Sequence, residues 1–441
     1  MVYISVQIAL SELFLFMKLK SLYTLQLLLL SAYIQAQEIG SIEIGKRYAI
    51  RSETLNEERF YDIYLPASYN SRINATYPVL YIMDGDYNFW YIAGMIEQMA
   101  SVGNKIPEMI VVGIADNGHE NYINNCTPYN KQKSPNGQSE KFLKFIATEL
   151  RPQIERMYRT ADFDILAGHS LGGYFVINAL LSEPKSFNAY IAISPSLWKN
   201  DYEAETQVEE FFKKNENLNR YLYMSLGNEK GMGVYGFHNQ MDINTFADEY
   251  YKNAPLGLHY AFKQYPNENH NSVGLITIND GLKFIFEGYD VGEDELSSMQ
   301  TFKAYEERIA KFVVMLGPNF RLPENQLTAM VKKLCDSNEI AILQEAIKER
   351  YPASLGDYYN ALANIYMRNK KYDDAIKTAE QNYNLNPKTP EYITTLADVY
   401  LAGKESDKAK AMYRKALDMA YEIGARQWYI NQLKANVSNV K

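Results

Sequence analysis

The fold of this chain is decided by the stretch FDILAGHSLGG, residues 163–173. It joins a short apolar run, typical of a buried strand, to a glycine-flanked serine and to the helical pattern of residues 174–181. A serine at a tight strand-to-helix turn is the setting of a nucleophile elbow, in which the serine backbone is strained and its hydroxyl stands at the top of a sheet. Gly168 and Gly172 let strand and helix come close, and the helix dipole favours an anion beside Ser170. The stretch therefore predicts an ester-cleaving or acyl-transferring enzyme.

Strand and helix patterns alternate on both sides of this turn. Further runs typical of strands cover 59–65, 78–83, 109–114, 190–194, 221–227 and 258–265. Helical spacing of apolar residues covers 88–100, 140–157, 203–214, 240–252 and 279–286. Such alternation favours a doubly wound, mostly parallel sheet. We therefore expect an α/β fold with one enzyme domain over residues 37–290.

The pattern changes beyond the acidic, glycine-containing segment 288–298, because no further strands are indicated. We expect a linker or helix over 291–320 and a small all-α domain over 321–441. Leucine, alanine and tyrosine positions recur after a 34-residue period, as Leu362, Ala363, Tyr366 and Ala375 and then Leu396, Ala397, Tyr400 and Ala409. This resembles the tetratricopeptide repeat, and 321–349 could form a degenerate helical pair in front of it. The resemblance implies a protein partner or self-association through the helical repeats.

Composition excludes several classes of function. The chain has 441 residues, 47% of them hydrophobic, which favours two globular domains. A net charge of -8 without a Lys- or Arg-rich run argues against nucleic-acid binding. The two cysteines, Cys126 and Cys335, lack metal-ligand spacing; one bridge between them is an alternative, but buried free thiols are favoured. We expect neither a metal site nor a cofactor.

The first 36 residues are expected to be a secretory signal peptide. A basic start at 17–20 precedes the apolar run 22–30, and small Ala36 follows. Met17 is an alternative start, because the segment before it lacks a positive charge. The run of about nine apolar residues is too short to span a bilayer, so cleavage is favoured over a membrane anchor. We therefore expect a secreted or periplasmic protein.

A serine nucleophile needs a base, and the chain offers five histidines. His270 lies in the polar stretch NENHNS, residues 267–272, after the last expected strand and before the last helix. That is the place of the base in hydrolases with the chain order serine, acid, histidine. His169 adjoins the nucleophile on a tight turn and is expected to line the site. The remaining histidines are His119 in a loop and His238 and His259, taken as ordinary structural residues.

The acid of the triad is expected after the strand 221–227, where Glu229 lies. A carboxylate that is hydrogen-bonded to the imidazole would fix its tautomer and stabilise its charged form. Asp248 and Glu249 are alternatives within an expected helix.

Two backbone amides are expected to form the oxyanion hole. The first is the N–H of Leu171, which directly follows the nucleophile. The second comes from the turn Asp84-Gly85-Asp86 after the strand 78–83, where the glycine would let the amide of Asp86 point inward.

Taken together, these motifs resemble the esterase-D-like, or putative esterase, family of α/β-hydrolases. The resemblance covers about 40–288 and rests on YPVLYIMDGD at 77–86, the elbow at 168–173, SPSLW at 194–198 and the His270 loop. It implies a serine carboxylesterase with Ser170, His270 and Glu229 as the triad. The family includes siderophore trilactone esterases, feruloyl and acetyl-xylan esterases, S-formylglutathione hydrolases and mycolyltransferases.

Two features bear on the substrate of such an enzyme. Trp198 and Tyr87 are expected to wall the pocket, where flat aromatic faces suit a lipidic, aromatic or sugar-linked ester. Siderophore-cleaving members of the family tend to carry an arginine, followed by Thr-Pro, after the strand equivalent to 109–114. This chain keeps Thr127-Pro128 but reads HENY at 119–122, which weakens the siderophore interpretation.

The main hypothesis is a serine esterase that acts through an acyl-enzyme, and a siderophore trilactone esterase is an alternative. A second hypothesis is a non-catalytic hydrolase-fold scaffold that recruits partners through its helical repeats. Acyl transfer in place of hydrolysis is a third.

Overall fold

The structure, a computed structural model, describes residues 14–21, 42–199, 203–215 and 217–440. The chain divides into two compact units, Met1–Glu43 and Ile44–Lys441. In the first, residues 14–21 are helical, while the expected apolar run of the signal peptide lies outside the described residues. Within the described ranges, no helix is both long and apolar enough to cross a membrane.

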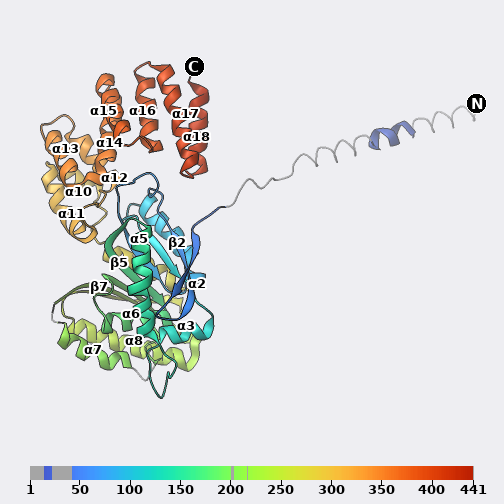
Figure 1. Ribbon diagram of the computed structural model, residues 1–441, viewed down its shortest axis with the longest axis vertical. Coiled ribbons are helices and arrows are strands. Elements are labelled where there is room, and N and C mark those ends of the chain that lie inside the picture. The colour runs from blue at the N-terminus through green and yellow to red at the C-terminus, as the bar shows by residue number, and fades with distance from the viewer. Residues whose placement is uncertain (1–13, 22–41, 200–202, 216, 441) are drawn as a thin grey trace, which may run out of the picture. The chain divides into compact units, whose positions relative to one another are not determined.

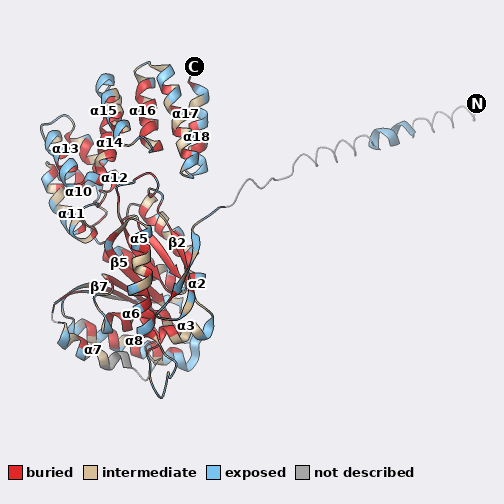
Figure 2. Ribbon diagram, in the orientation of Figure 1, coloured by how far each residue is buried: buried red, intermediate tan, exposed pale blue. Residues whose placement is uncertain are grey.

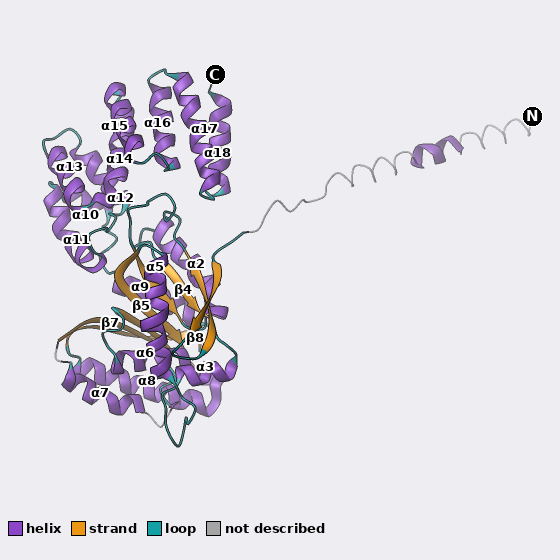
Figure 3. Cartoon of the chain, in the orientation of Figure 1, coloured by secondary structure: helices purple, strands orange, loops and turns teal. Residues whose placement is uncertain are grey.

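One eight-stranded sheet forms the centre of the α/β part, with helices on both of its faces (Figures 1 and 3). Its order is β1-β2-β4-β3-β5-β6-β7-β8. Among the described strands, the β1–β2 and β2–β4 pairings are antiparallel and the other five are parallel, so the sheet is mostly parallel, as predicted. The strands are β1 (Lys46–Ser52), β2 (Glu57–Tyr64), β3 (Tyr77–Ile82), β4 (Ile110–Ile114), β5 (Thr160–His169), β6 (Ala189–Ile193), β7 (Asn217–Asn228) and β8 (Leu256–Asn269).

The buried strands separate two apolar cores, because successive side chains of a strand point to opposite faces. In β3, Leu80 and Ile82 join one core, whereas Val79 and Tyr81 join the other. Figure 2 shows the inner strands of the sheet as largely buried, and β3, β4 and β6 are buried along their whole length. Such two-sided burial explains why these strands have apolar runs rather than alternation. The edge strand β1 was not predicted, because its sequence KRYAIRS is largely exposed and carries three cationic side chains.

Helices α2 and α9 pack on the first face, and α4 to α8 contribute to the core on the second. The helices of the α/β part are α2 (Gly85–Glu97), α3 (His119–Cys126), α4 (Ser139–Phe145), α5 (Arg151–Met157), α6 (Leu171–Ser182), α7 (Glu203–Lys214), α8 (Gly233–Asn253) and α9 (Val273–Ile285). The helix expected over 140–157 is interrupted by the π-helical segment η2 (Ile146–Leu150), directly before Pro152 in the first turn of α5. Proline has no N–H for the helical hydrogen bond and displaces the preceding turn, which accounts for the interruption.

The elements described after the sheet are all helices. They are α10 (Glu293–Ser298), α11 (Phe302–Leu316), α12 (Glu324–Leu334), α13 (Glu339–Arg350), α14 (Leu355–Arg368), α15 (Tyr372–Leu385), α16 (Pro390–Ala402), α17 (Ser406–Glu422) and α18 (Gln427–Asn439). The stretch 291–320, expected as a linker or helix, thus holds two helices. Phe302, Phe312 and Leu327 lie in the same apolar core as Leu80 of the sheet. The first helices after the sheet therefore share its core, and a separate core follows between α14 and α18.

Both cysteines are free thiols: Cys126 is buried at the end of α3, and Cys335 is partly buried.

Candidate active site

Ser170 lies at the turn between β5 and α6, with φ 57° and ψ −116°. A positive φ is a strained conformation for a residue with a side chain. The glycines on either side make the turn possible: a Cβ on Gly168 would lie 2.4 Å from the carbonyl oxygen of Gly172, and one on Gly173 would lie 3.0 Å from the Cα of Pro195. The backbone of Ser170 is held by a hydrogen bond from its own N–H to the carbonyl of Ile193, and its carbonyl accepts from Tyr174 and Ser196.

The sheet register brings the expected acid and base together. Asn228 at the end of β7 is paired with Asn269 at the end of β8. Glu229 and His270 are the next residues, so they leave the carboxyl edge of the sheet side by side, where sites of open α/β sheets form. The turn that carries His270 is fixed by Asn269, whose Oδ1 accepts hydrogen bonds from the amides of Asn271 and Ser272.

Ser170, His270 and Glu229 form a continuous chain of contacts. The Oγ of Ser170 lies 3.0 Å from Nε2 of His270. Nδ1 of His270 lies 2.8 Å from Oε2 of Glu229, and the side chain of Glu229 is fully buried. This contact has the distance of a hydrogen bond but not its angle, because the N–H of Nδ1 does not point along the line to that oxygen. Such contacts often tighten only when substrate is bound. The alternatives Asp248 and Glu249 lie in α8, as expected.

His169 contacts the backbone of the His270 loop. Its Nε2 is 2.7 Å from the carbonyl oxygen of His270, and the two imidazole rings are 4.6 Å apart. A carbonyl can only accept, so Nε2 of His169 must carry the proton. Burial, and then the neighbouring His270, lower the pKa of His169 to about 4. His169 is therefore neutral at pH 7 and holds the loop of the expected base.

The two expected oxyanion amides belong to the first turns of helices. Leu171 is the first residue of α6, and Asp86 is the second residue of α2. Amides in the first turn of a helix have no carbonyl one turn back to accept their hydrogen bonds. They also lie at the positive end of the helix dipole. Asp84, which precedes α2, has φ 54° and ψ 49°, so the turn before Asp86 begins with a left-handed residue.

Two hydroxyl groups beside Ser170 were not predicted from the sequence. The Oγ of Ser196 lies 3.2 Å from the Oγ of Ser170. The hydroxyl of Tyr122, in α3, accepts a hydrogen bond of 2.9 Å from the amide of Gly172 and donates one of 2.9 Å to Oδ2 of Asp84. The sequence contained one signal for Tyr122, which is that it lies shortly after β4. Because β4 and β3 are parallel neighbours, the residues that follow the two strands meet at the same edge of the sheet.

The two aromatic residues expected in the pocket differ in exposure. Tyr87, in the first turn of α2, is 81% exposed. Trp198 is partly buried, and its ring centre lies 5.2 Å from that of Tyr235 at the start of α8, with the two rings tilted by 39°. Helix α8 follows Glu229 after a short 3-10 helix (Glu229–Met232) and exposes further apolar side chains, among them Val234 and Phe237.

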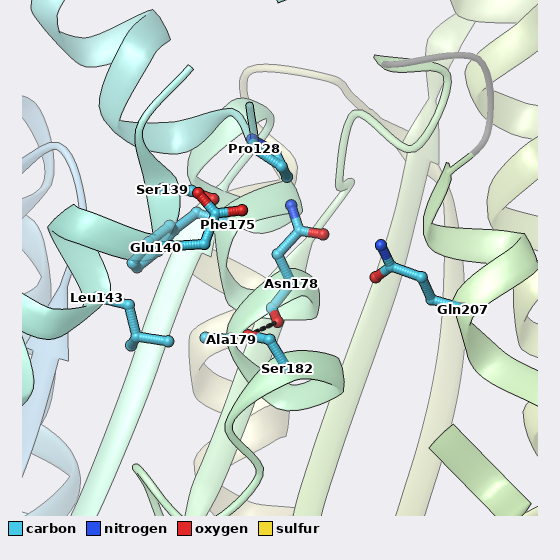
Figure 4. Close-up of a pocket in the computed structure, with 9 residues that line it drawn as sticks. All are labelled: Pro128, Ser139, Glu140, Leu143, Phe175, Asn178, Ala179, Ser182 and Gln207. Atoms are coloured by element: carbon cyan, nitrogen blue, oxygen red, sulfur yellow. Dashed lines mark hydrogen bonds between the residues drawn. The ribbon is translucent and has the colours of Figure 1, made fainter. Parts of the chain in front are cut away.

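The pocket in Figure 4 is separate from these groups. It lies against the same helix α6, but none of Ser170, Glu229 and His270 lines it. Its walls include Ser139, Phe175 and Asn178. The described pocket is therefore no part of the contact chain around Ser170.

Two family models match this chain. Residues 52–234 match the family described as "Putative esterase", and residues 356–389 and 390–422 match the tetratricopeptide repeat. The repeat matches agree with the 34-residue period of the sequence.

Curated relatives and solved structures agree with the first match. The chain is 27% identical over 255 residues to the ferri-bacillibactin esterase BesA of Bacillus subtilis, covering 52% of this chain and 86% of BesA. It is 29% identical over 175 residues to the siderophore triacetylfusarinine C esterase of Aspergillus fumigatus, covering 35% of this chain and 60% of that protein. The crystal structure of an IroE-like serine hydrolase from Shewanella oneidensis superposes with a TM-score of 0.61 at 26% identity, covering 69% of this chain and 99% of that one. The match over residues 52–234 is therefore to a family of esterases, hydrolases that act on ester bonds, and residues 356–422 match two tetratricopeptide repeats.

Proposed function

We propose that this protein is a secreted or periplasmic serine esterase that hydrolyses carboxylic esters through an acyl-enzyme. Ser170 attacks the ester carbonyl, His270 takes the serine proton and returns it to the leaving alcohol, and Glu229 orients His270. The amides of Leu171 and Asp86 hold the oxyanion. Water then attacks the acyl-enzyme, with His270 again as the base. No cofactor is needed for these steps.

The observation that carries this proposal is the contact chain from Ser170 through His270 to Glu229, with distances of 3.0 Å and 2.8 Å. A nucleophile within hydrogen-bond reach of a base, with the base held by a third group, is the arrangement that activates serine. The strained backbone of Ser170 adds support, because strain persists where the surrounding structure enforces it.

For the substrate, we propose an ester with an aromatic or lipidic group. Exposed Tyr87 on α2 offers a flat surface, and the apolar start of α8 offers an aliphatic one. The start of α8 contacts Trp198, which lies two residues after Ser196, the neighbour of Ser170. A siderophore trilactone is the second candidate, because relatives of this chain are named as siderophore esterases.

One feature speaks against an anionic siderophore. One cationic side chain near residues 119–122 is Arg59, which is only 1% exposed. Its guanidinium donates to Oδ1 of Asn121 and to the carbonyl of Ala115. It therefore offers no charge to a ligand.

The test is labelling with a fluorophosphonate probe, since only an activated serine reacts. We expect one adduct, located on Ser170 by peptide mass spectrometry, and hydrolysis of p-nitrophenyl acetate or butyrate by the same preparation. An unlabelled protein without activity would instead favour the scaffold that recruits partners through its repeats.

Two further experiments define the reaction. Product analysis with added alcohol or sugar acceptors separates hydrolysis from acyl transfer. A panel of acetyl, feruloyl, acyl-lipid and trilactone esters identifies the substrate class.

Replacement of His169 by phenylalanine should lower kcat about tenfold, because the carbonyl of His270 loses its hydrogen-bond donor. His169→Gln keeps a donor at a similar reach and should recover most of the loss. Steady-state kinetics on p-nitrophenyl butyrate compares the two variants. Equal losses in both would mean that the hydrogen bond does not position His270.

A further inference from the structure

A cluster of acidic and hydroxyl groups underlies the turn of Ser170, outside the contact chain of the triad. Asp84 follows β3 and Asp116 follows β4, and these two parallel strands are neighbours in the sheet. After burial, the charge of Asp116 and a hydrogen bond between the two side chains raise the pKa of Asp84, so the two carboxyl groups lie close together. Two carboxylates this close cannot both be ionised without strong repulsion, so one proton is retained between them.

Tyr122 connects this acid pair to the nucleophile turn. Its hydroxyl donates to Oδ2 of Asp84 at 2.9 Å and accepts from the amide of Gly172 at 2.9 Å. It also lies 3.4 Å from the carbonyl oxygen of His169. The residues contacted by Tyr122 thus lie on both sides of Ser170. A Cβ on Gly172 would come within 3.3 Å of Oδ2 of Asp84, so carboxyl and turn are in close contact.

The same acid also belongs to the other half of the oxyanion hole. The carbonyl of Asp84 accepts hydrogen bonds from the amides of Tyr87 and Asn88 and so begins α2. Asp86, two residues on, accepts from the amide of Asp116 through its Oδ2 and from Arg47 through its Oδ1. Asp84 and Asp116 therefore touch both turns whose amides the proposed reaction uses.

We propose that Asp84 and Asp116 share one proton and act, through the hydroxyl of Tyr122, as positioning residues for the oxyanion hole, so that loss of this proton at alkaline pH lowers kcat. The inference rests on the proposed esterase function. A second negative charge at this place would oppose the negative charge that develops on the carbonyl oxygen of the substrate.

The electrostatics of the cluster agree with this. Burial, above all, and the charge and hydrogen bond of Asp116 raise the pKa of Asp84 to about 8. Burial also raises the pKa of Asp116. The titratable and charged groups that face the pair from the elements packed against it are Asp86, Tyr91, Tyr122, Cys126 and Arg59. Arg59 is the buried cation among them.

Two amide substitutions separate this role from a purely structural one. Asp84→Asn resembles the protonated acid, because its amide can donate to Asp116 and its oxygen can accept from Tyr122. We expect kcat of the wild type to fall above about pH 8, whereas kcat of Asp84→Asn stays level. Asp116→Asn removes the charge that helps Asp84 to keep its proton, so its alkaline fall should begin at lower pH. Glu120→Gln, an exposed carboxylate in the same helix as Tyr122, is the matched control and should follow the wild type.

The proposal is overturned if Asp84→Asn keeps the alkaline fall of the wild type, or if both amide variants shift it in the same direction. A second measurement does not depend on esterase activity. An acid whose pKa is higher in the folded than in the unfolded protein lowers stability as pH rises from its unfolded to its folded value. The midpoint of thermal unfolding should therefore decline more steeply from pH 4 to 8 in the wild type than in Asp84→Asn. Equal slopes would overturn proton sharing even if no ester were found to react.

Discussion

Ser170→Ala should lower kcat for ester hydrolysis by about 10⁶-fold, and His270→Ala should have an effect of the same order. The reason is that the two side chains act as one unit: without the base 3.0 Å away, the serine hydroxyl keeps its proton, and without the hydroxyl the base has no nucleophile to activate. Glu229→Gln leaves the nucleophile and the base in place and should cost about 10⁴-fold. Initial rates with p-nitrophenyl butyrate, measured over the background hydrolysis, give these ratios.

The double variant Ser170→Ala/His270→Ala provides the sharper criterion. If the residues act together, it should be no slower than either single variant, because their effects are not additive. His119→Ala is the matched control, since this histidine is exposed at the start of α3, and it should retain wild-type kcat. Additive losses, or a Glu229→Gln variant with full activity, would argue against the proposed roles.

The parts of this site that were predictable from the sequence are those encoded locally. The glycines at 168, 172 and 173 mark the elbow because a Cβ at any of these positions would come within 3.0 Å of a neighbouring atom. The order of the strands along the chain placed Glu229 and His270 at the ends of the last two strands. Their proximity depends on the pairing of Asn228 with Asn269, which no local pattern encodes.

The parts that were not predictable depend on long-range contacts of polar residues. Tyr122 is 50 residues from Gly172, and its hydrogen bond results from the packing of α3 against α6. Asp84 was recognised only as part of a turn, because a carboxyl that keeps its proton has the same sequence signature as an ordinary turn aspartate. The edge strand β1 was missed for the opposite reason: its charged, exposed residues lack the apolar pattern by which strands are found.

The contact between the sheet and the helical repeats depends on a buried acid, Asp357 in α14. Its Oδ1 accepts hydrogen bonds from Arg72, in the connection between β2 and β3, and from Tyr392 in α16, at 3.2 Å and 2.7 Å. Its Oδ2 accepts one of 2.6 Å from Arg321. The guanidinium of Arg72 also lies over the ring of Tyr392, 4.5 Å from its centre. Both arginines are largely buried and also pair with Glu108, Glu324 and Glu391, but Asp357 is the fully buried carboxylate that they share.

Asp357→Ala should lower the free energy of unfolding by about 3–5 kcal/mol, because it removes the fully buried carboxylate that Arg72 and Arg321 share. Burial alone would raise the pKa of Asp357, but Arg321 and Arg72 outweigh it and bring this pKa to about 2. An acid with a depressed folded-state pKa contributes stability above its unfolded value of 3.8, and this contribution is lost as pH falls towards 2. The wild type should therefore lose stability between about pH 4 and 2 more steeply than Asp357→Asn, as measured by urea denaturation. Glu391→Gln, which removes a partly exposed carboxylate from the same Arg72, should cost less than about 1 kcal/mol. If both replacements cost equally little, the helical repeats are held to the sheet by their shared apolar core and not by this charge cluster.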